Sequence, residues 1–103
     1  MVGLASAAGL VGFLSEPDPE LRVFALKTLD SQIDLLWTEV VDAVPQIEAL
    51  YEDESFPERE LAALVAAKVY YHLQEYNESM VFALGAGKLF KLENGGEFEE
   101  TII

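Results

Sequence analysis

The fold is decided by Leu61-Ala62-Ala63-Leu64-Val65-Ala66-Ala67-Lys68-Val69-Tyr70-Tyr71-His72-Leu73. At four-residue spacing, most rows of a helix over 57–73 are nonpolar, and only Glu60, Lys68 and His72 mark a polar edge. A helix that is apolar over most of its circumference must be covered on more than one side, and its alanines let neighbouring backbones come close. We therefore predict a central helix with packing partners before and after it in the chain.

A second helix is expected after a turn over 73–79. The residues expected on its buried face, at positions i, i+4, i+7, i+8 and i+11, are Tyr76, Met80, Ala83, Leu84 and Gly87. Gly85 and Gly87 weaken the C-terminal end of this helix, so they indicate either close packing or a helix stop.

This helical pair has spacings similar to those of a tetratricopeptide repeat. The residues at these spacings are Ala67, Tyr70, Tyr71, Tyr76, Ser79 and Ala86. Gln74 stands where that repeat prefers glycine, Ser79 stands where it prefers alanine, and no second copy follows at a period of about 34 residues. The fold class predicted is all-α, with antiparallel helical hairpins stacked as the start of an α-solenoid.

Earlier in the chain, Asp18 is a candidate N-cap for a helix from Pro19 to about Thr28. Its expected apolar stripe is Leu21, Phe24, Ala25 and Leu29. The pair Asp30-Ser31 is read as the cap of a further helix, which Pro45 either kinks or ends by starting a new one. The apolar positions of that region are Ile33, Leu36, Trp37, Val40, Val41, Val44, Ile47, Leu50 and Tyr51. Ser55 or Phe56 is then expected just ahead of a helix start at Pro57.

The first residues, Met1 to Leu14, are apolar and invite comparison with a secretory signal. They lack the basic region that such signals carry, and they are too short to span a bilayer, which takes about 20 residues. A short amphipathic helix with Leu10, Phe13 and Leu14 on one face explains them better.

Composition narrows the function classes. The chain has 103 residues, 51% hydrophobic content, no cysteine and a formal net charge of −13. One modest core fits this length. The absence of cysteine excludes disulfides and thiolate metal sites. The acidity disfavours binding to nucleic acid or to anionic membranes, since both depend on clustered Lys and Arg.

Residues with catalytic potential are few. His72 has no cysteine to pair with and is read as a half-exposed surface residue, and Glu75 and Glu78 lie near it only in sequence. Glu52, Asp53 and Glu54 suggest a calcium site, but they lack the alternating ligands, the central glycine and the terminal glutamate of an EF-hand loop. No enzyme activity, cofactor or metal is expected. Glu52, Asp53, Glu54 and Glu58 are a candidate acidic rim for partner contact, with ordinary solvated surface as the alternative.

The C-terminal part contains a turn at Glu93-Asn94-Gly95-Gly96 and a helix-like pattern over 97–103. Because that pattern reaches Ile102-Ile103 without a polar stop, we expect residues 1–103 to be a single helical N-terminal region, the start of a longer helical rod.

Seven strings together make the chain resemble the N-terminus of the 26S proteasome non-ATPase regulatory subunit 1 family. They are Ser6-Ala7-Ala8-Gly9, Phe24-Ala25-Leu26, Leu50-Tyr51-Glu52-Asp53-Glu54, Ala62-Ala63-Leu64-Val65-Ala66, Lys68-Val69-Tyr70-Tyr71-His72-Leu73, Ala83-Leu84-Gly85-Ala86-Gly87 and Glu100-Thr101-Ile102-Ile103. The resemblance implies the larger scaffold subunit in the base of the regulatory particle, with a helical rod, a toroid of proteasome/cyclosome repeats and a tail that docks a ubiquitin receptor. The toroid and the tail would lie beyond Ile103.

Two functions follow as hypotheses. The resemblance implies a non-catalytic scaffold segment in cytoplasm and nucleus, in contact with other regulatory-particle subunits and with following helices of the parent chain. The alternative is a free-standing helical-repeat adaptor that binds peptides or partner proteins in a groove, although the chain has only six Lys and Arg residues to clamp acidic peptide ends.

Overall fold

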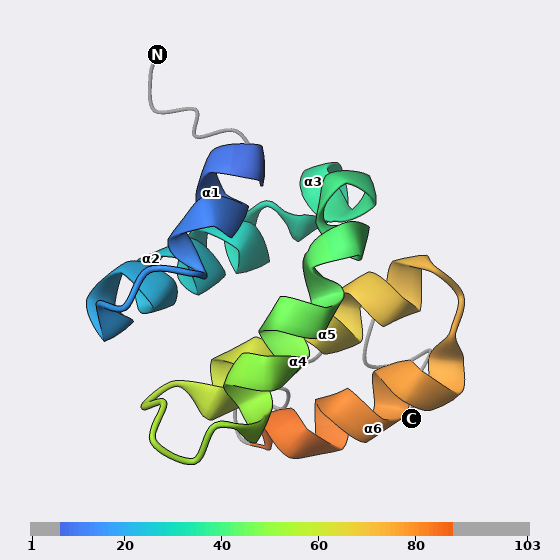
Figure 1. Cartoon of the computed structure of the whole chain (residues 1–103). Coiled ribbons are helices and arrows are strands. Elements are labelled where there is room, and N and C mark those ends of the chain that lie inside the picture. The colour runs from blue at the N-terminus through green and yellow to red at the C-terminus, as the bar shows by residue number, and fades with distance from the viewer. Residues whose placement is uncertain (1–6, 88–103) are drawn as a thin grey trace.

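The structure, a computed structural model, describes residues 7–87, and each regular element in that range is helical (Figure 1). The elements are α1 (Ala7–Phe13), α2 (Pro19–Ser31), α3 (Ile33–Val40), a 3₁₀ turn η1 (Val41–Ala43), α4 (Val44–Glu52), α5 (Arg59–His72) and α6 (Tyr76–Ala86). This confirms the all-α prediction. The expected turn at 93–96 and helix over 97–103 lie outside the described residues.

Helix α5 lies at the centre of the fold. It contacts α2, α3 and α4, which precede it in the chain, and α6, which follows it. Its residues 61–67 and Val69 are all buried. The prediction of a central helix with neighbours before and after it is therefore confirmed. Figure 1 shows α6 returning antiparallel to α5 after a tight turn, so the predicted hairpin is present as well.

The turn between α5 and α6 closes through two backbone hydrogen bonds. The Gln74 N–H donates to the Tyr71 carbonyl at 3.0 Å and the Glu75 N–H donates to the Tyr70 carbonyl at 2.9 Å. This pair of bonds is the Schellman motif that commonly ends a helix, and it needs a left-handed residue. Gln74 supplies it with φ of 64°. The position where the repeat comparison expected glycine is thus one where the backbone favours glycine.

The buried face of α6 differs from the expected one. Ser79, Ala83 and Ala86 are buried against the core, and the Ser79 hydroxyl donates to the Ala67 carbonyl of α5 at 2.7 Å. Of the predicted set, Ala83 is buried, but Tyr76, Met80 and Leu84 are exposed, so the prediction was wrong for these three. The physical reason is side-chain size. Close approach of two helix backbones requires small residues at the contact, and the predicted row carried the large ones.

The sequence left two explanations for Gly85 and Gly87, close packing or a helix stop, and the structure shows one of each. A Cβ on Gly85 would lie 2.5 Å from the Tyr51 hydroxyl, so this glycine allows the Tyr51 ring of α4 to pack closely against α6. Gly87 caps α6 with φ of 57°, so it marks the helix stop.

The N-terminal helices follow the expected pattern with two changes. Asp18 caps α2 by accepting the Glu20 N–H at 2.9 Å, as predicted, and α2 extends beyond Thr28 to Ser31. Phe24, expected on the buried stripe, is half exposed and packs edge-on against Phe13, with 6.1 Å between ring centroids.

Helix α1 matches the expected amphipathic helix. Leu10 and Leu14 are buried, and Phe13 packs partly buried beside them.

The junction of α2 and α3 corrects a predicted cap. Asp30 and Ser31 are the last residues of α2, and Gln32 stands at the N-cap of α3 without a side-chain hydrogen bond. Asp30 instead forms an ion pair with Lys68 of α5, which explains its position better than capping. Pro45 lies in the first turn of α4, so of the two alternatives for this proline, a new helix start is the observed one.

Helix α5 begins at Arg59, two residues after the predicted start at Pro57. Glu58 holds the N-cap position of α5 without a side-chain hydrogen bond. The Phe56 side chain is buried in the core. Its burial holds the preceding loop against the core, and the helix begins after the turn at Pro57 and Glu58.

Candidate interaction surfaces

The predicted acidic rim is a group of neighbours around the loop between α4 and α5. Glu52 ends α4, Asp53 and Glu54 follow in the loop, and Glu58 precedes α5. Glu52 and Glu54 are exposed, whereas Asp53 and Glu58 are half-buried. Only two of the four carboxylates are therefore fully presented to solvent.

The interior of this loop is organised by local hydrogen bonds. The Asp53 carboxylate accepts both the Ser55 N–H at 2.9 Å and the Ser55 hydroxyl at 2.6 Å. These bonds to Ser55, with a smaller contribution from Arg22 and Arg59, lower the pKa of Asp53. The Asp53 carboxylate therefore stabilises the turn formed by residues 53–55.

Arg59 adds a positive charge beside the acidic rim. Its Nε donates to the Tyr51 carbonyl at 2.7 Å, and its guanidinium lies 5.6 Å from the centroid of the Tyr51 ring. The Tyr51 carbonyl belongs to the last turn of α4, where carbonyls lack intrahelical partners. Arg59 therefore joins the end of α4 to the start of α5, and sequence patterns gave no indication of this role.

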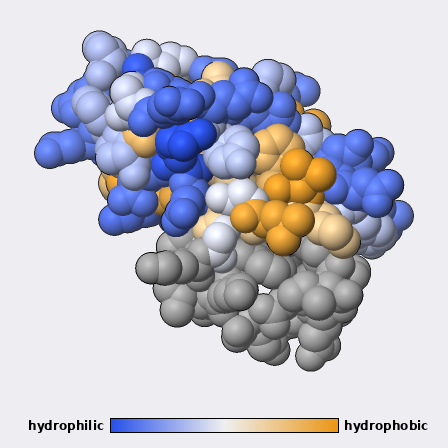
Figure 2. All heavy atoms as spheres, turned by 90° about the horizontal axis from the view of Figure 1, so that it is seen from below, coloured by the Kyte–Doolittle hydropathy of each residue, from blue (hydrophilic) through white to orange (hydrophobic). Residues whose placement is uncertain are grey.

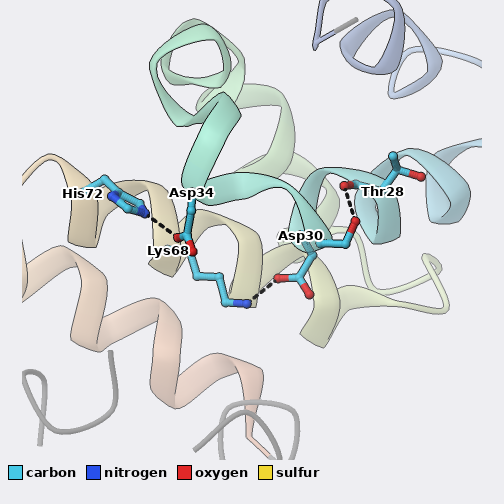
Figure 3. A network of polar contacts seen from close by, with 6 residues as sticks. Thr28, Asp30, Asp34, Lys68 and His72 are labelled. Atoms are coloured by element: carbon cyan, nitrogen blue, oxygen red, sulfur yellow. Dashed lines mark hydrogen bonds and ion pairs between the residues drawn. The ribbon is translucent and has the colours of Figure 1, made fainter. Parts of the chain in front are cut away.

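The polar edge of α5 faces two acids at the junction of α2 and α3 (Figure 3). Lys68 Nζ lies 2.8 Å from Asp30 Oδ1, and His72 Nε2 lies 3.0 Å from Asp34 Oδ1. The acids are four residues apart across the junction of α2 and α3, and Lys68 and His72 are four residues apart on α5, so the two polar pairs meet with matching spacing. That matched spacing is the sequence signal that could have revealed the contact.

His72 is half-buried, as predicted, with 23% of its side chain exposed. Its ring stacks on Trp37 with centroids 5.3 Å apart and planes 6° from parallel. Within residues 7–87, no group of three or more His, Cys, Asp or Glu side chains is placed to hold a metal ion. The contacts of His72 are those of a structural residue joining α3 to α5.

An apolar surface lies on α6 outside the small residues that are buried against α5. We call Tyr76, Met80, Val81 and Leu84 the α6 outer face, and their exposed fractions are 44%, 41%, 63% and 74%. Figure 2, viewed from the side on which α6 lies, shows apolar surface gathered in a patch beside hydrophilic surface. Among the described residues, no helix is both long and apolar enough to cross a membrane.

The antiparallel helical hairpin and the alanine-rich central helix between its neighbours define an all-α fold of the helical-repeat type, the start of a solenoid. Comparison with protein families makes this specific. The family model for the N-terminal domain of 26S proteasome subunit RPN2 matches residues 5–103, and the chain belongs to this family.

Known relatives support the assignment along nearly the whole chain. A 26S proteasome non-ATPase regulatory subunit 1 of Drosophila melanogaster is 49% identical over 99% of the chain. The 26S proteasome regulatory subunit rpn2 of Schizosaccharomyces pombe is 50% identical over 97%, and the RPN2 subunit of Saccharomyces cerevisiae is 40% identical over 99%. The chain spans only 10 to 11% of the length of these relatives.

Proposed function

We propose that this chain is a non-catalytic scaffold segment of the 26S proteasome regulatory particle that supports particle assembly and, through it, ubiquitin-dependent protein degradation. The observation that carries the proposal is the family match over residues 5–103, together with relatives that are named as proteasome regulatory subunits. The partners are other regulatory-particle subunits and further helices of the parent protein, and the compartments are cytoplasm and nucleus.

The architecture supports a mechanical role. In a helical solenoid each repeat contacts its neighbours, so a segment contributes by holding the next one in position. Helix α5 has the required features, since its apolar residues are buried between α2, α3, α4 and α6. The segment acts as an arm whose rigidity comes from this packing, and its acidic surface discourages nonspecific association.

The test replaces the matching segment of the Saccharomyces cerevisiae relative with this chain. The chimera should restore intact 26S particles on native gels and normal turnover of a ubiquitin-dependent reporter. Leu64→Asp, which buries a charge in α5, should abolish both, whereas Leu35→Asp at a position 81% exposed should leave both intact. A chimera that folds but fails to enter the particle, or a Leu64→Asp chimera that assembles normally, contradicts the proposal.

The adaptor alternative makes a different prediction in a purification experiment. Tagged chain recovered from cell extract should bring down proteasome regulatory subunits if it is a scaffold segment. Recovery of unrelated chaperone clients without proteasome subunits would favour the adaptor.

Within this scaffold we propose that the acidic rim contributes to partner contact. Glu52→Lys with Glu54→Lys reverses the two exposed charges and spares Asp53, which holds its own turn. The double variant should weaken assembly and alter its salt dependence. The matched control, Glu39→Lys with Asp42→Lys, reverses two exposed acids elsewhere. Unchanged assembly and salt dependence in the rim variant would reduce the rim to ordinary solvated surface.

A further inference from the structure

Three of the five serines are followed, three residues later, by a carboxylate. The pairs are Ser15 with Asp18, Ser31 with Asp34 and Ser55 with Glu58. This spacing is that of a capping box, in which the serine caps a helix. In the structure the N-caps of α2, α3 and α5 are instead Asp18, Gln32 and Glu58. Helix capping by the serines therefore does not account for the pattern.

The same spacing is a recognition signal for acid-directed serine kinases, which bind the carboxylate three residues after the serine with a basic surface. Such a kinase binds its substrate as an extended segment, so the residues that follow the serine must be accessible. Ser15 meets this requirement, because it lies in the loop between α1 and α2 and residues 15–20 are all exposed.

The other two serines are less accessible in the folded chain. Phe56, the residue directly after Ser55, is 3% exposed, and Ile33, two residues after Ser31, is also 3% exposed. A kinase could bind either segment only after a buried side chain had left the core, which requires local unfolding. Folding therefore leaves Ser15 as the accessible member of the three.

Hydrogen bonds also distinguish Ser15 from the other two serines. Its Oγ accepts a side-chain N–H of Gln46, on α4, at 2.7 Å. By contrast, the hydroxyls of the other two serines donate, one to the Thr28 carbonyl at 2.8 Å and the other to the Asp53 carboxylate at 2.6 Å. Phosphorylation replaces the hydroxyl proton, so it removes a donated bond and places negative charge against an oxygen, whereas an accepted bond can persist.

We propose that Ser15 is a phosphorylation site for an acid-directed serine kinase that uses ATP. A bond forms between the Ser15 Oγ and the γ-phosphorus of ATP, and the bond from that phosphorus to its bridging oxygen breaks. ADP leaves, and the hydroxyl proton passes to the catalytic base of the kinase. The loop offers the new phosphate N–H donors, since Gln46 binds Ser15 and the Arg22 Nε donates to the Glu16 carbonyl at 2.6 Å. The inference does not depend on the proposed proteasome role.

The first test compares the folded chain with peptides. Full-length chain is incubated with casein kinase 2 and ATP, and phosphorylation of each serine is followed by mass spectrometry of phosphopeptides. Ser15 should react at least about tenfold faster than Ser31 or Ser55, because those two react only after local unfolding. In synthetic peptides over 9–21, 25–37 and 49–61 this advantage should disappear, since a peptide has no core.

Absent or slow reaction of Ser15 in the folded chain would overturn the inference, and so would reaction of Ser31 or Ser55 at an equal rate. An equally large preference for Ser15 among the peptides would show that the fold does not select this serine.

A second test removes the recognition charge without removing the helix cap. Asp18→Asn keeps a side chain that caps α2, because Asn caps helices as well as Asp does, and Tm checks that the fold is kept. Phosphorylation of Ser15 should slow by about tenfold or more, since the carboxylate that the kinase binds is gone. The matched control Asp42→Asn removes an exposed acid elsewhere and should leave the rate unchanged. Unchanged phosphorylation of the Asp18→Asn chain would contradict the proposal.

Discussion

At the scale of single residues, Gln74 adopts a left-handed backbone conformation that normally favours glycine, and this costs free energy of folding. Its φ of 64° completes the turn after α5, and a side chain in this left-handed conformation costs about 1 kcal/mol or more. Gln74→Gly should therefore stabilise the chain by about 0.5 to 1 kcal/mol in urea unfolding. Gln74→Ala, which keeps a Cβ, is the control. A glycine variant no more stable than the alanine variant would contradict this reading of the turn.

Tyr70 provides a second test, based on pH. Its hydroxyl donates to the Glu48 carboxylate, and this bond, with partial burial, raises the pKa of Tyr70 to about 12. Because the folded-state pKa is raised above the ordinary value of about 10, the stabilising bond is fully present below pH 10 and is lost as the pH rises toward 12.

Tyr70→Phe should therefore cost about 1 kcal/mol at neutral pH, and the difference should disappear near pH 12. Ultraviolet titration of the four tyrosines at alkaline pH should lose its highest phase in the variant. A titration that keeps that phase would show that Tyr70 is not the perturbed tyrosine.

At the scale of secondary-structure elements, Gly85 and Gly12 form a matched pair, since both lie in helices. A Cβ on Gly85 would meet the Tyr51 ring. That ring is held in place by the Phe82 ring, with 5.7 Å between the centroids, and by the Arg59 guanidinium over its face. A Cβ on Gly12 would meet nothing within 4 Å.

Gly12→Ala should therefore stabilise the chain by about 0.5 to 1 kcal/mol, whereas Gly85→Ala should destabilise it by about 1 to 3 kcal/mol. Thermal unfolding of the two variants measures the contrast. Equal stabilisation by both substitutions would mean that the Tyr51 ring does not pack closely against α6 at Gly85.

The helices could be predicted from sequence where a pattern had one physical meaning. The sequence of α5 is apolar around most of the helix, so it cannot form a surface helix with a broad polar side. The pair Asp18-Pro19 can begin a helix but cannot continue one. Spacing did not identify the buried side of α6, because that helix is apolar on two sides and the choice depends on which side carries small residues.

The contacts of the candidate surfaces were harder to predict, because they join residues far apart in sequence. The sequence predicts Asp30 to be part of a cap, because Asp is a good N-cap, whereas the structure pairs it with Lys68, which is 38 positions away in the chain. Arg59 binds the end of α4, a role that no local pattern could indicate. For the acidic rim, sequence identified the group of neighbours but not the Ser55 bonds that occupy Asp53.

At the scale of the whole molecule, charge repulsion opposes folding. The chain carries 19 acidic and six basic Lys and Arg residues, so the compact state concentrates negative charge. Raising sodium chloride from about 10 mM to about 500 mM should therefore raise Tm, because salt screens this repulsion. The Lys68–Asp30 pair is only 14 to 17% exposed and should lose little by screening. A Tm that falls with salt would mean that attractive ion pairs dominate.

The central claim for the molecule is that α5 is buried between helices that precede and follow it, which makes the chain a unit for stacking. Amide hydrogen exchange of the full-length chain, resolved by NMR, tests this most directly. The amides of Leu64 to Val69 should exchange only through global unfolding and be among the slowest in the protein. Exchange of these amides as fast as in an unfolded peptide would contradict the account.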